Sequence, residues 1–122
     1  MTVYFYDSYA LIEYFKHNSH FDSYFEEHTG LLTSLNLVEV YYSLLNEAGK
    51  AKADSMFETL YPLMVEPSKE TLKRAMLFRF MHKKKKLSCA DCIGYGVAKE
   101  RNIKFLTGDE QFRNIDNVEF VK

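Results

Sequence analysis

Four acidic residues carry the strongest indication of chemistry in this chain. Asp7 and Asp109 each follow a short apolar run that predicts a buried strand, and Asp91 and Glu39 each lie early in a predicted helix. In an open α/β sheet, ligands bind beyond the carboxyl ends of the strands. We therefore expect the four carboxylates to meet at that edge of the sheet.

Carboxylates gathered without matching lysines or arginines repel one another and are costly to remove from water. A divalent cation is the usual remedy at neutral pH, and a site made only of oxygen ligands suits Mg²⁺ or Mn²⁺ better than zinc. Such an ion polarises a phosphodiester, helps to deprotonate a water molecule and stabilises the leaving oxygen. The four acids therefore predict a metal site for phosphodiester hydrolysis.

Each acid taken alone also has a purely structural interpretation. Asp7, Asp91 and Asp109 stand at predicted helix starts, where free backbone amides and the helix dipole favour a carboxylate. Glu39 is compatible with a solvated position on an amphipathic helix. Only the convergence of the four acids favours the chemical interpretation.

Two hydroxyl residues lie close to the acids in sequence. Ser8 follows Asp7 directly, and Thr107 precedes Asp109 with one residue between them. Such hydroxyls either hold a carboxylate or a water molecule by hydrogen bonding, or are ordinary turn residues. Both interpretations stay open for the sequence alone.

A run of basic residues precedes the helix that carries Asp91. Its members are Lys83, Lys84, Lys85 and Lys86. Next to an acidic site, this strip would contact substrate phosphates, and Arg74 and Arg79 on the preceding predicted helix would extend it. The alternative is a solvated helix terminus, where lysines are favoured by the negative end of the helix dipole.

The composition is that of one folded domain, residues 1–122. Hydrophobic residues make up 47% of the chain, including 10 Phe and 9 Tyr, which is enough to pack one core. A formal net charge of −1 provides no global positive field for a nucleic acid. No apolar stretch is long enough for a membrane span, and residues 1–7 lack signal-peptide features. We expect a cytoplasmic protein without membrane contact.

Strand and helix patterns alternate along the chain. Short apolar runs rich in β-formers predict strands, and runs with apolar residues at helical spacing predict helices. The predicted strands are residues 2–6, 31–33, 63–65, 103–106 and 118–121. The predicted helices begin after Asp7, Ser19, Ser34, Gly49, Ser68 and Ser88, and the four serines are the predicted N-terminal caps of their helices.

This alternation has no Asn-Gly type of hairpin signal, so it predicts parallel strands with helices on both faces. Right-handed crossovers then bring the carboxyl ends of the strands to one edge. We expect a three-layer α/β/α fold with a central, mostly parallel sheet of four to five strands.

The only cysteines, Cys89 and Cys92, form a Cys-x-x-Cys pair. Such pairs are redox-active in some proteins and supply half of a zinc site in others. A zinc site needs two further ligands at comparable spacing, and none of the four histidines offers one. We expect both cysteines to be packing residues on a buried helix face.

Two short motifs surround the first two acids. Residues 6–8 read Tyr-Asp-Ser and are followed by Leu11 and Ile12. Glu39 stands within the apolar segment 37–40.

Two further motifs surround the other acids. Asp91 lies within residues 88–92, Ser-Cys-Ala-Asp-Cys, and residues 107–109, Thr-Gly-Asp, are followed by Phe112. Together, in this order and over nearly the whole chain, these motifs resemble those of the PIN domains, and most closely those of the VapC-like toxins of bacterial and archaeal toxin–antitoxin pairs.

The resemblance implies a Mg²⁺- or Mn²⁺-dependent endoribonuclease in which Asp7, Glu39, Asp91 and Asp109 surround the metal. It also implies a dimeric toxin that a cognate antitoxin holds inactive by inserting its tail into the site. RNA, an antitoxin and a second copy of the chain are thus the implied partners.

The chain departs from the family pattern in the helix after Asp91. Gly94 and Gly96 stand where alanines are usual. Each glycine costs about 1 kcal/mol of helix stability relative to alanine, so the shape and rigidity of this helix are open questions.

Three alternatives compete with a toxin ribonuclease. A phosphate-accepting receiver domain needs an aspartate after a central strand, and the only mid-chain candidate, Asp54, lies in a polar helical run. A non-catalytic PIN-like binding module is disfavoured because all four acids are present. A housekeeping RNA-processing nuclease without an antitoxin stays open, and the presence of an adjacent antitoxin-like reading frame would decide against it.

Overall fold

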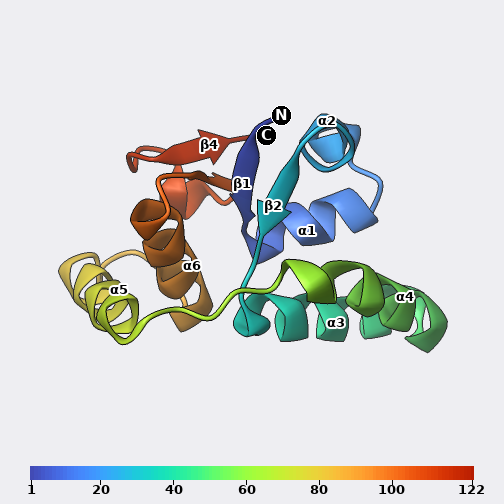
Figure 1. Ribbon diagram of the computed structural model, residues 1–122, viewed down its shortest axis with the longest axis horizontal. Coiled ribbons are helices and arrows are strands. Elements are labelled where there is room, and N and C mark those ends of the chain that lie inside the picture. The colour runs from blue at the N-terminus through green and yellow to red at the C-terminus, as the bar shows by residue number, and fades with distance from the viewer.

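The computed structural model describes residues 1–122 and has a parallel β-sheet between layers of helices (Figure 1). The strands are β1 (Val3–Tyr6), β2 (Thr29–Leu31), β3 (Lys104–Thr107) and β4 (Val118–Phe120). Their order across the sheet is β2-β1-β3-β4, and every neighbouring pair is parallel. The predicted three-layer fold is confirmed, with four strands in its sheet.

The predicted helices are all present, and short 3₁₀ turns connect them to other elements. The α-helices are α1 (Ser8–Phe15), α2 (Asp22–Glu26), α3 (Ser34–Ala48), α4 (Lys50–Leu60), α5 (Lys69–Met81) and α6 (Cys89–Glu100). The 3₁₀ helices are η1 (Ser19–Phe21), η2 (Tyr61–Leu63) and η3 (Glu110–Phe112). None of the helices combines the length and apolar character that a membrane crossing requires.

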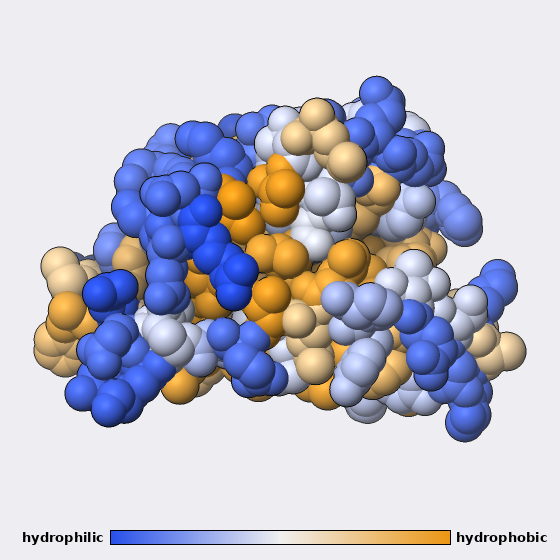
Figure 2. Space-filling model, in the orientation of Figure 1, coloured by the Kyte–Doolittle hydropathy of each residue, from blue (hydrophilic) through white to orange (hydrophobic).

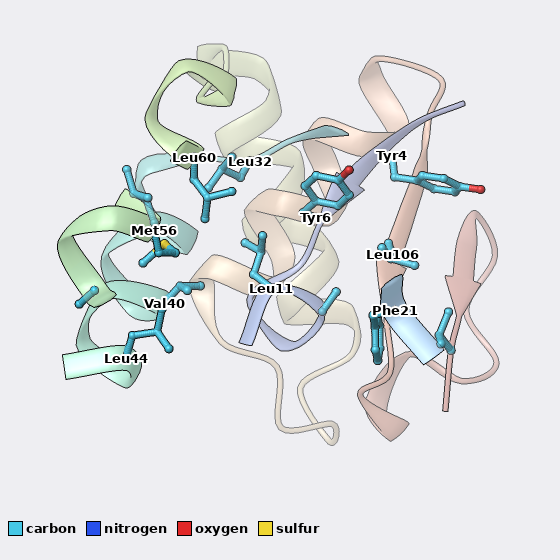
Figure 3. Close-up of a cluster of buried hydrophobic side chains, with 14 residues drawn as sticks. Tyr4, Tyr6, Leu11, Phe21, Leu32, Val40, Leu44, Met56, Leu60 and Leu106 are labelled. Carbon is cyan, nitrogen blue, oxygen red and sulfur yellow. The ribbon is translucent and has the colours of Figure 1, made fainter. Parts of the chain in front are cut away.

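Alternating side chains of β1 divide the core into two halves. Tyr4 and Tyr6 face one side, where they pack with residues of α1, α3 and α4 (Figure 3). Phe5 faces the other side, where it stacks on Phe105 of β3, with 5.7 Å between ring centroids, and packs with residues of α5 and α6. Because successive strand residues point to opposite faces, one short strand anchors both helix layers.

The predicted strand at residues 63–65 is wrong. Only Leu32 and Met64 pair there, as an isolated parallel bridge. The chain forms η2 immediately before Met64, and on the other side it turns into α3 directly after Leu32, so neither segment is extended long enough for a ladder.

Local capping chemistry sets most helix boundaries as predicted. The Ser68 and Ser88 side chains accept hydrogen bonds from the third residue of α5 and α6, respectively. Asn102 ends α6 with a positive φ of 56°, a conformation that asparagine tolerates. Two predicted caps lie one residue away from the observed ones: Thr33 rather than Ser34 precedes α3, and Asn18 rather than Ser19 caps η1.

The two glycines of α6 have different surroundings. A Cβ atom at Gly94 would lie 2.6 Å from Cε1 of Phe5 and 3.2 Å from Cε1 of Phe105, so glycine lets α6 approach the sheet. A Cβ atom at Gly96 would lie 3.2 Å from Cγ2 of Thr71 in α5, which is a tight but less severe contact. Glycine at position 94 therefore lowers the helix propensity of α6 but allows α6 to pack closely on the sheet.

We expect Gly94→Ala to lower the free energy of unfolding by about 1–3 kcal/mol, because the added methyl group overpacks the core against Phe5. Gly96→Ala is the matched control: its gain of helix propensity, about 1 kcal/mol, offsets the tighter contact with Thr71. Urea unfolding followed by circular dichroism measures both. Equal stability of the two variants would contradict the close approach at Gly94.

Candidate active site

Asp7 is a buried carboxylate at the end of β1. Its backbone N–H still donates to the carbonyl of Leu106, at 3.1 Å, so strand pairing holds the residue in place. The side chain is 1% exposed; Oδ2 accepts a hydrogen bond from Oγ1 of Thr107 at 2.7 Å, and Oδ1 has no partner. Asp7 precedes α1 but makes no capping hydrogen bond through its side chain. The capping interpretation of Asp7 is therefore wrong.

The electrostatic environment of Asp7 disfavours its charge. Burial raises the pKa of this carboxyl group to about 8, repulsion from Asp91 and Asp109 adds to the increase, and the hydrogen bond from Thr107 opposes it. A buried polar atom without a partner is rare because leaving it unpaired costs free energy. Asp7 is therefore a group that a cation would stabilise.

Asp91 combines a capping role with a place beside Asp7. Its Oδ2 accepts from the backbone N–H of Ser88 at 2.8 Å, while its own N–H donates to Oγ of Ser88 at 3.1 Å, which is a capping box. Burial raises the pKa of Asp91, and repulsion from Asp109 and Glu39 acts in the same direction.

Asp109 follows β3 and opens η3. Its Oδ1 accepts from the backbone N–H of Gln111 at 3.0 Å. Its own N–H donates to Oγ1 of Thr107 at 3.1 Å, and the same hydroxyl donates to Asp7. Thr107 therefore joins the first and fourth acids through one hydroxyl group.

Glu39 lies on α3 with an exposed side chain that Ser8 holds in place. Oγ of Ser8 donates to Oε1 of Glu39 at 2.7 Å, and Nδ2 of Asn36 donates to Oγ of Ser8 at 3.0 Å. An amide nitrogen can only donate, so the single proton of Ser8 is directed at Glu39. Thr33 donates to Oδ1 of Asn36 through both its N–H and its hydroxyl, which fixes the amide.

Asn36 is the residue of this site that the sequence did not indicate. It is fully buried, and it occupies a position on α3 where an amphipathic pattern calls for an apolar residue. A polar residue on the buried stripe, one helical turn before Glu39, is the signal that would have identified it.

The four acids share one arrangement. In each carboxylate one oxygen accepts a hydrogen bond from Thr107, Ser8, the Ser88 N–H or the Gln111 N–H, and the other accepts none from the protein. No lysine or arginine forms an ion pair with any of them, and their mutual repulsion links all four.

The donor set fits Mg²⁺ or Mn²⁺. All available ligand atoms are carboxylate oxygens, and Oδ1 of Asp7 lacks any other partner. No three side chains of His, Cys, Asp or Glu lie close enough together to enclose an ion. Mg²⁺ keeps several waters and needs only one or two carboxylates, so a closed cage is not required.

Comparison with known proteins identifies the family. The model of the PIN domain matches residues 4–118. The chain belongs to the PIN domain family.

Solved structures share this fold. A toxin–antitoxin complex from Klebsiella pneumoniae superposes with a TM-score of 0.74 at 16% identity, covering 98% of this chain and 96% of the other. VapBC2 from Rickettsia felis bound to a promoter DNA fragment superposes with a TM-score of 0.72 at 16% identity, covering 99% and 100%. A search of curated protein sequences finds no match.

Two further acids of this PIN domain are paired with cations: Glu110 adjoins Asp109, whereas Asp116 precedes β4 and lies at the opposite edge of the sheet. Glu110 forms a salt bridge with Arg113 at 2.6 Å, and Asp116 forms one with Lys99 at 3.1 Å. Their charges are compensated by neighbouring cations, in contrast to those of the four site acids.

The lysine run forms the connection between α5 and α6. No salt bridge involves Lys83, Lys84, Lys85 or Lys86. The backbone N–H of Lys86 donates to Oε1 of Gln111 at 3.3 Å, which places the connection next to η3 and Asp109. The strip therefore adjoins the acidic edge.

The cysteines of this PIN domain differ from each other. Cys92 is buried in the core, as expected, and burial raises the pKa of its thiol to about 11. Cys89 is exposed, and its Sγ accepts a hydrogen bond from Nη1 of Arg79 at 3.0 Å, so its predicted packing role is wrong.

The raised pKa of Asp7 predicts a pH-dependent stability in the absence of divalent cations. The folded state holds a proton on Asp7 that the unfolded state loses above pH 4, so the free energy of unfolding falls as pH rises towards 8, by up to about 1.4 kcal/mol per pH unit. Asp7→Asn removes this contribution and leaves a smaller one from Asp91. Urea unfolding in a chelating buffer from pH 5 to pH 8.5 measures it.

The matched control is Asp22→Asn, which changes an acid in the first turn of α2. This variant retains the pH dependence of the wild type. An Asp7→Asn protein with an unaltered pH profile would mean that Asp7 is ionised in the folded state without a cation.

Proposed function

We propose that this PIN domain is a Mg²⁺- or Mn²⁺-dependent endoribonuclease and the toxin component of a type II toxin–antitoxin pair. The observation that supports it most directly is the buried Asp7 carboxylate. One oxygen is held by Thr107, the other has no partner, and the neighbouring charges are all negative. A divalent cation compensates such a group, whereas a purely structural acid would have a donor at both oxygens.

In this proposal Asp7 and Asp109 hold the cation most directly, while Asp91 and Glu39 complete its surroundings and orient the attacking water. When bound, the cation supplies positive charge to the phosphodiester and lowers the pKa of water. Thr107 sets the spacing of Asp7 and Asp109, because its hydroxyl contacts both residues. Ser8 holds Glu39 so that Oε2 of that carboxylate stays free to accept a proton or a hydrogen bond.

The lysine run is proposed to contact RNA phosphates. Support comes from its place beside η3 and from the absence of acidic partners in the protein. Since the chain as a whole carries a net charge of −1, the attraction for a polyanion has to be local.

The protein partners are also proposals. The two structural neighbours come from toxin–antitoxin systems, which supports a cognate antitoxin for this chain. For the homodimer, the support is a stripe of exposed apolar residues on α3 with alternating spacings of three and four residues, the spacing of a helix–helix seam. The stripe consists of Leu35, Val38, Tyr42 and Leu45.

Asp7→Asn is expected to abolish cleavage of a panel of structured RNAs while folding is retained. Asparagine preserves the shape of the protonated side chain but cannot supply the negative charge that binds a cation. Wild type and variant are compared with Mg²⁺, with Mn²⁺ and with a chelator, using denaturing gels. Asp22→Asn serves as the active control.

The same variants test the toxin role. Expression of the wild type alone arrests growth of the host, and expression of Asp7→Asn does not. Cleavage by Asp7→Asn at the wild-type rate, or cleavage by the wild type in chelator, would contradict the metal-dependent nuclease.

Tyr42→Glu is expected to convert a dimer into a monomer, because it places a charge in the middle of the α3 stripe. Tyr61→Glu is the matched control, since Tyr61 is also exposed, at 52% compared with 69% for Tyr42, but lies on η2. Sedimentation velocity measures both. A wild-type protein that sediments as a monomer at all concentrations would overturn the dimer.

A further inference from the structure

A hollow of about 460 Å³ lies at the junction of α5 with the lysine run. Its apolar wall is made by Met76 and Phe80 of α5 and by Leu87 at the end of the connection. The Phe80 side chain is 65% exposed, an unusual state for a large aromatic residue. Figure 2 shows apolar residues exposed over α5 beside hydrophilic ones.

The remaining wall of the hollow is entirely cationic. It consists of Arg79, Lys83, Lys85 and Lys86, and no acid lines the hollow. Arg79 is fixed, because its Nε donates to the carbonyl of Leu87 at 3.0 Å and its Nη1 donates to Sγ of Cys89. Nζ of Lys83 lies 4.9 Å from the centroid of the Phe80 ring. An exposed aromatic ring, with Lys83 over one of its faces, and four cationic side chains therefore line the same hollow.

Hydrogen bonds connect residues of the hollow with two of the four acids. Leu87 lines it, and the next residue, Ser88, donates its N–H to Asp91. Lys86 also lines it, and its N–H donates to Gln111, which in turn donates its own N–H to Asp109. Asp91 and Asp109 are thus each one residue removed from the lining of the hollow, through Ser88 and Gln111, respectively.

We propose that this hollow binds one nucleotide of a single-stranded RNA next to the acids, an inference that rests on the proposed function. The base stacks on Phe80, and Arg79, Lys83, Lys85 and Lys86 contact the flanking phosphates. Only an unstacked base presents its face to an aromatic ring, so the hollow selects single-stranded segments over duplex. Lys84 does not line the hollow, so its proposed phosphate contact lies outside this nucleotide site.

Fluorescence anisotropy in a chelating buffer tests the proposal without cleavage. The probes are a short fluorescein-labelled single-stranded RNA of mixed sequence and the same strand in a duplex. Phe80→Ala is expected to weaken binding of the single strand about tenfold, and Phe80→Trp to retain it. Leu77→Ala is the control, since Leu77 is also exposed on α5 but lies outside the hollow.

A lysine outside the run provides the matched comparison for one inside it. Lys85→Met is expected to lower the slope of log affinity against log salt by about 0.7, the value for one contact with a single-stranded phosphate. Lys73→Met is the control: Lys73 lies on α5, outside both the hollow and the lysine run, so this substitution is expected to leave the slope unchanged. Equal effects of the two substitutions would show that the run attracts RNA only diffusely and would overturn the assignment of the hollow.

The competing occupant is a second copy of the chain. If Phe80→Ala leaves RNA affinity unchanged, the proposal is overturned, and a simultaneous shift of the sedimentation coefficient towards a monomer would identify the hollow as an interface between copies. Binding of duplex as tight as binding of the single strand would also overturn it. Phe80-dependent binding with no cleavage in Mg²⁺ or Mn²⁺ contradicts the nuclease and not the hollow.

Discussion

The structure of the site depends on burying one carboxylate where the sheet ends. Asp7 lies between β1 and α1, its backbone is held by strand pairing, and its side chain is buried. Thr107 satisfies one oxygen, and the other remains unpaired. Neighbouring acids then add repulsion to the cost of desolvation, which raises the pKa of Asp7 to about 8. This unfavourable energy is what a divalent cation would relieve in the proposed function.

Capping and chemistry are compatible roles for these acids. In Asp91 and Asp109, a backbone N–H at a helix start holds one carboxylate oxygen and thereby orients the other. In Asp7 and Glu39, a side-chain hydroxyl does the same. A hydrogen bond that caps a helix can therefore also orient the carboxylate for the proposed cation. Asn36 acts on Glu39 indirectly, because its hydrogen bond to Ser8 directs the Ser8 proton towards Glu39.

The protein has a net charge close to zero, but it carries one unpaired acidic cluster and one unpaired basic cluster. The four acids have no ion-pair partners, and neither do the four lysines of the α5–α6 connection, although the two groups are adjacent. Two other acids, Glu110 next to Asp109 and Asp116 at the opposite edge of the sheet, are paired with cations. A polyanionic substrate that needs a cation for cleavage and positive charge for binding matches this division.

The sequence by itself determined the alternation of strands and helices, the caps at Ser68 and Ser88, and the positions of the four acids on the elements. These features depend on residues close together in the chain, whose spacing and capping chemistry act locally. Tertiary structure alone decided that residues 63–65 form one bridge, that Gly94 lies against Phe5, and that Asn36 directs Ser8. It also decided that Phe80 stands open beside the lysines. The bond from Thr107 to Asp7 joins residues 100 positions apart, and burial, proton direction and pKa follow from contacts of that kind, which no local pattern encodes.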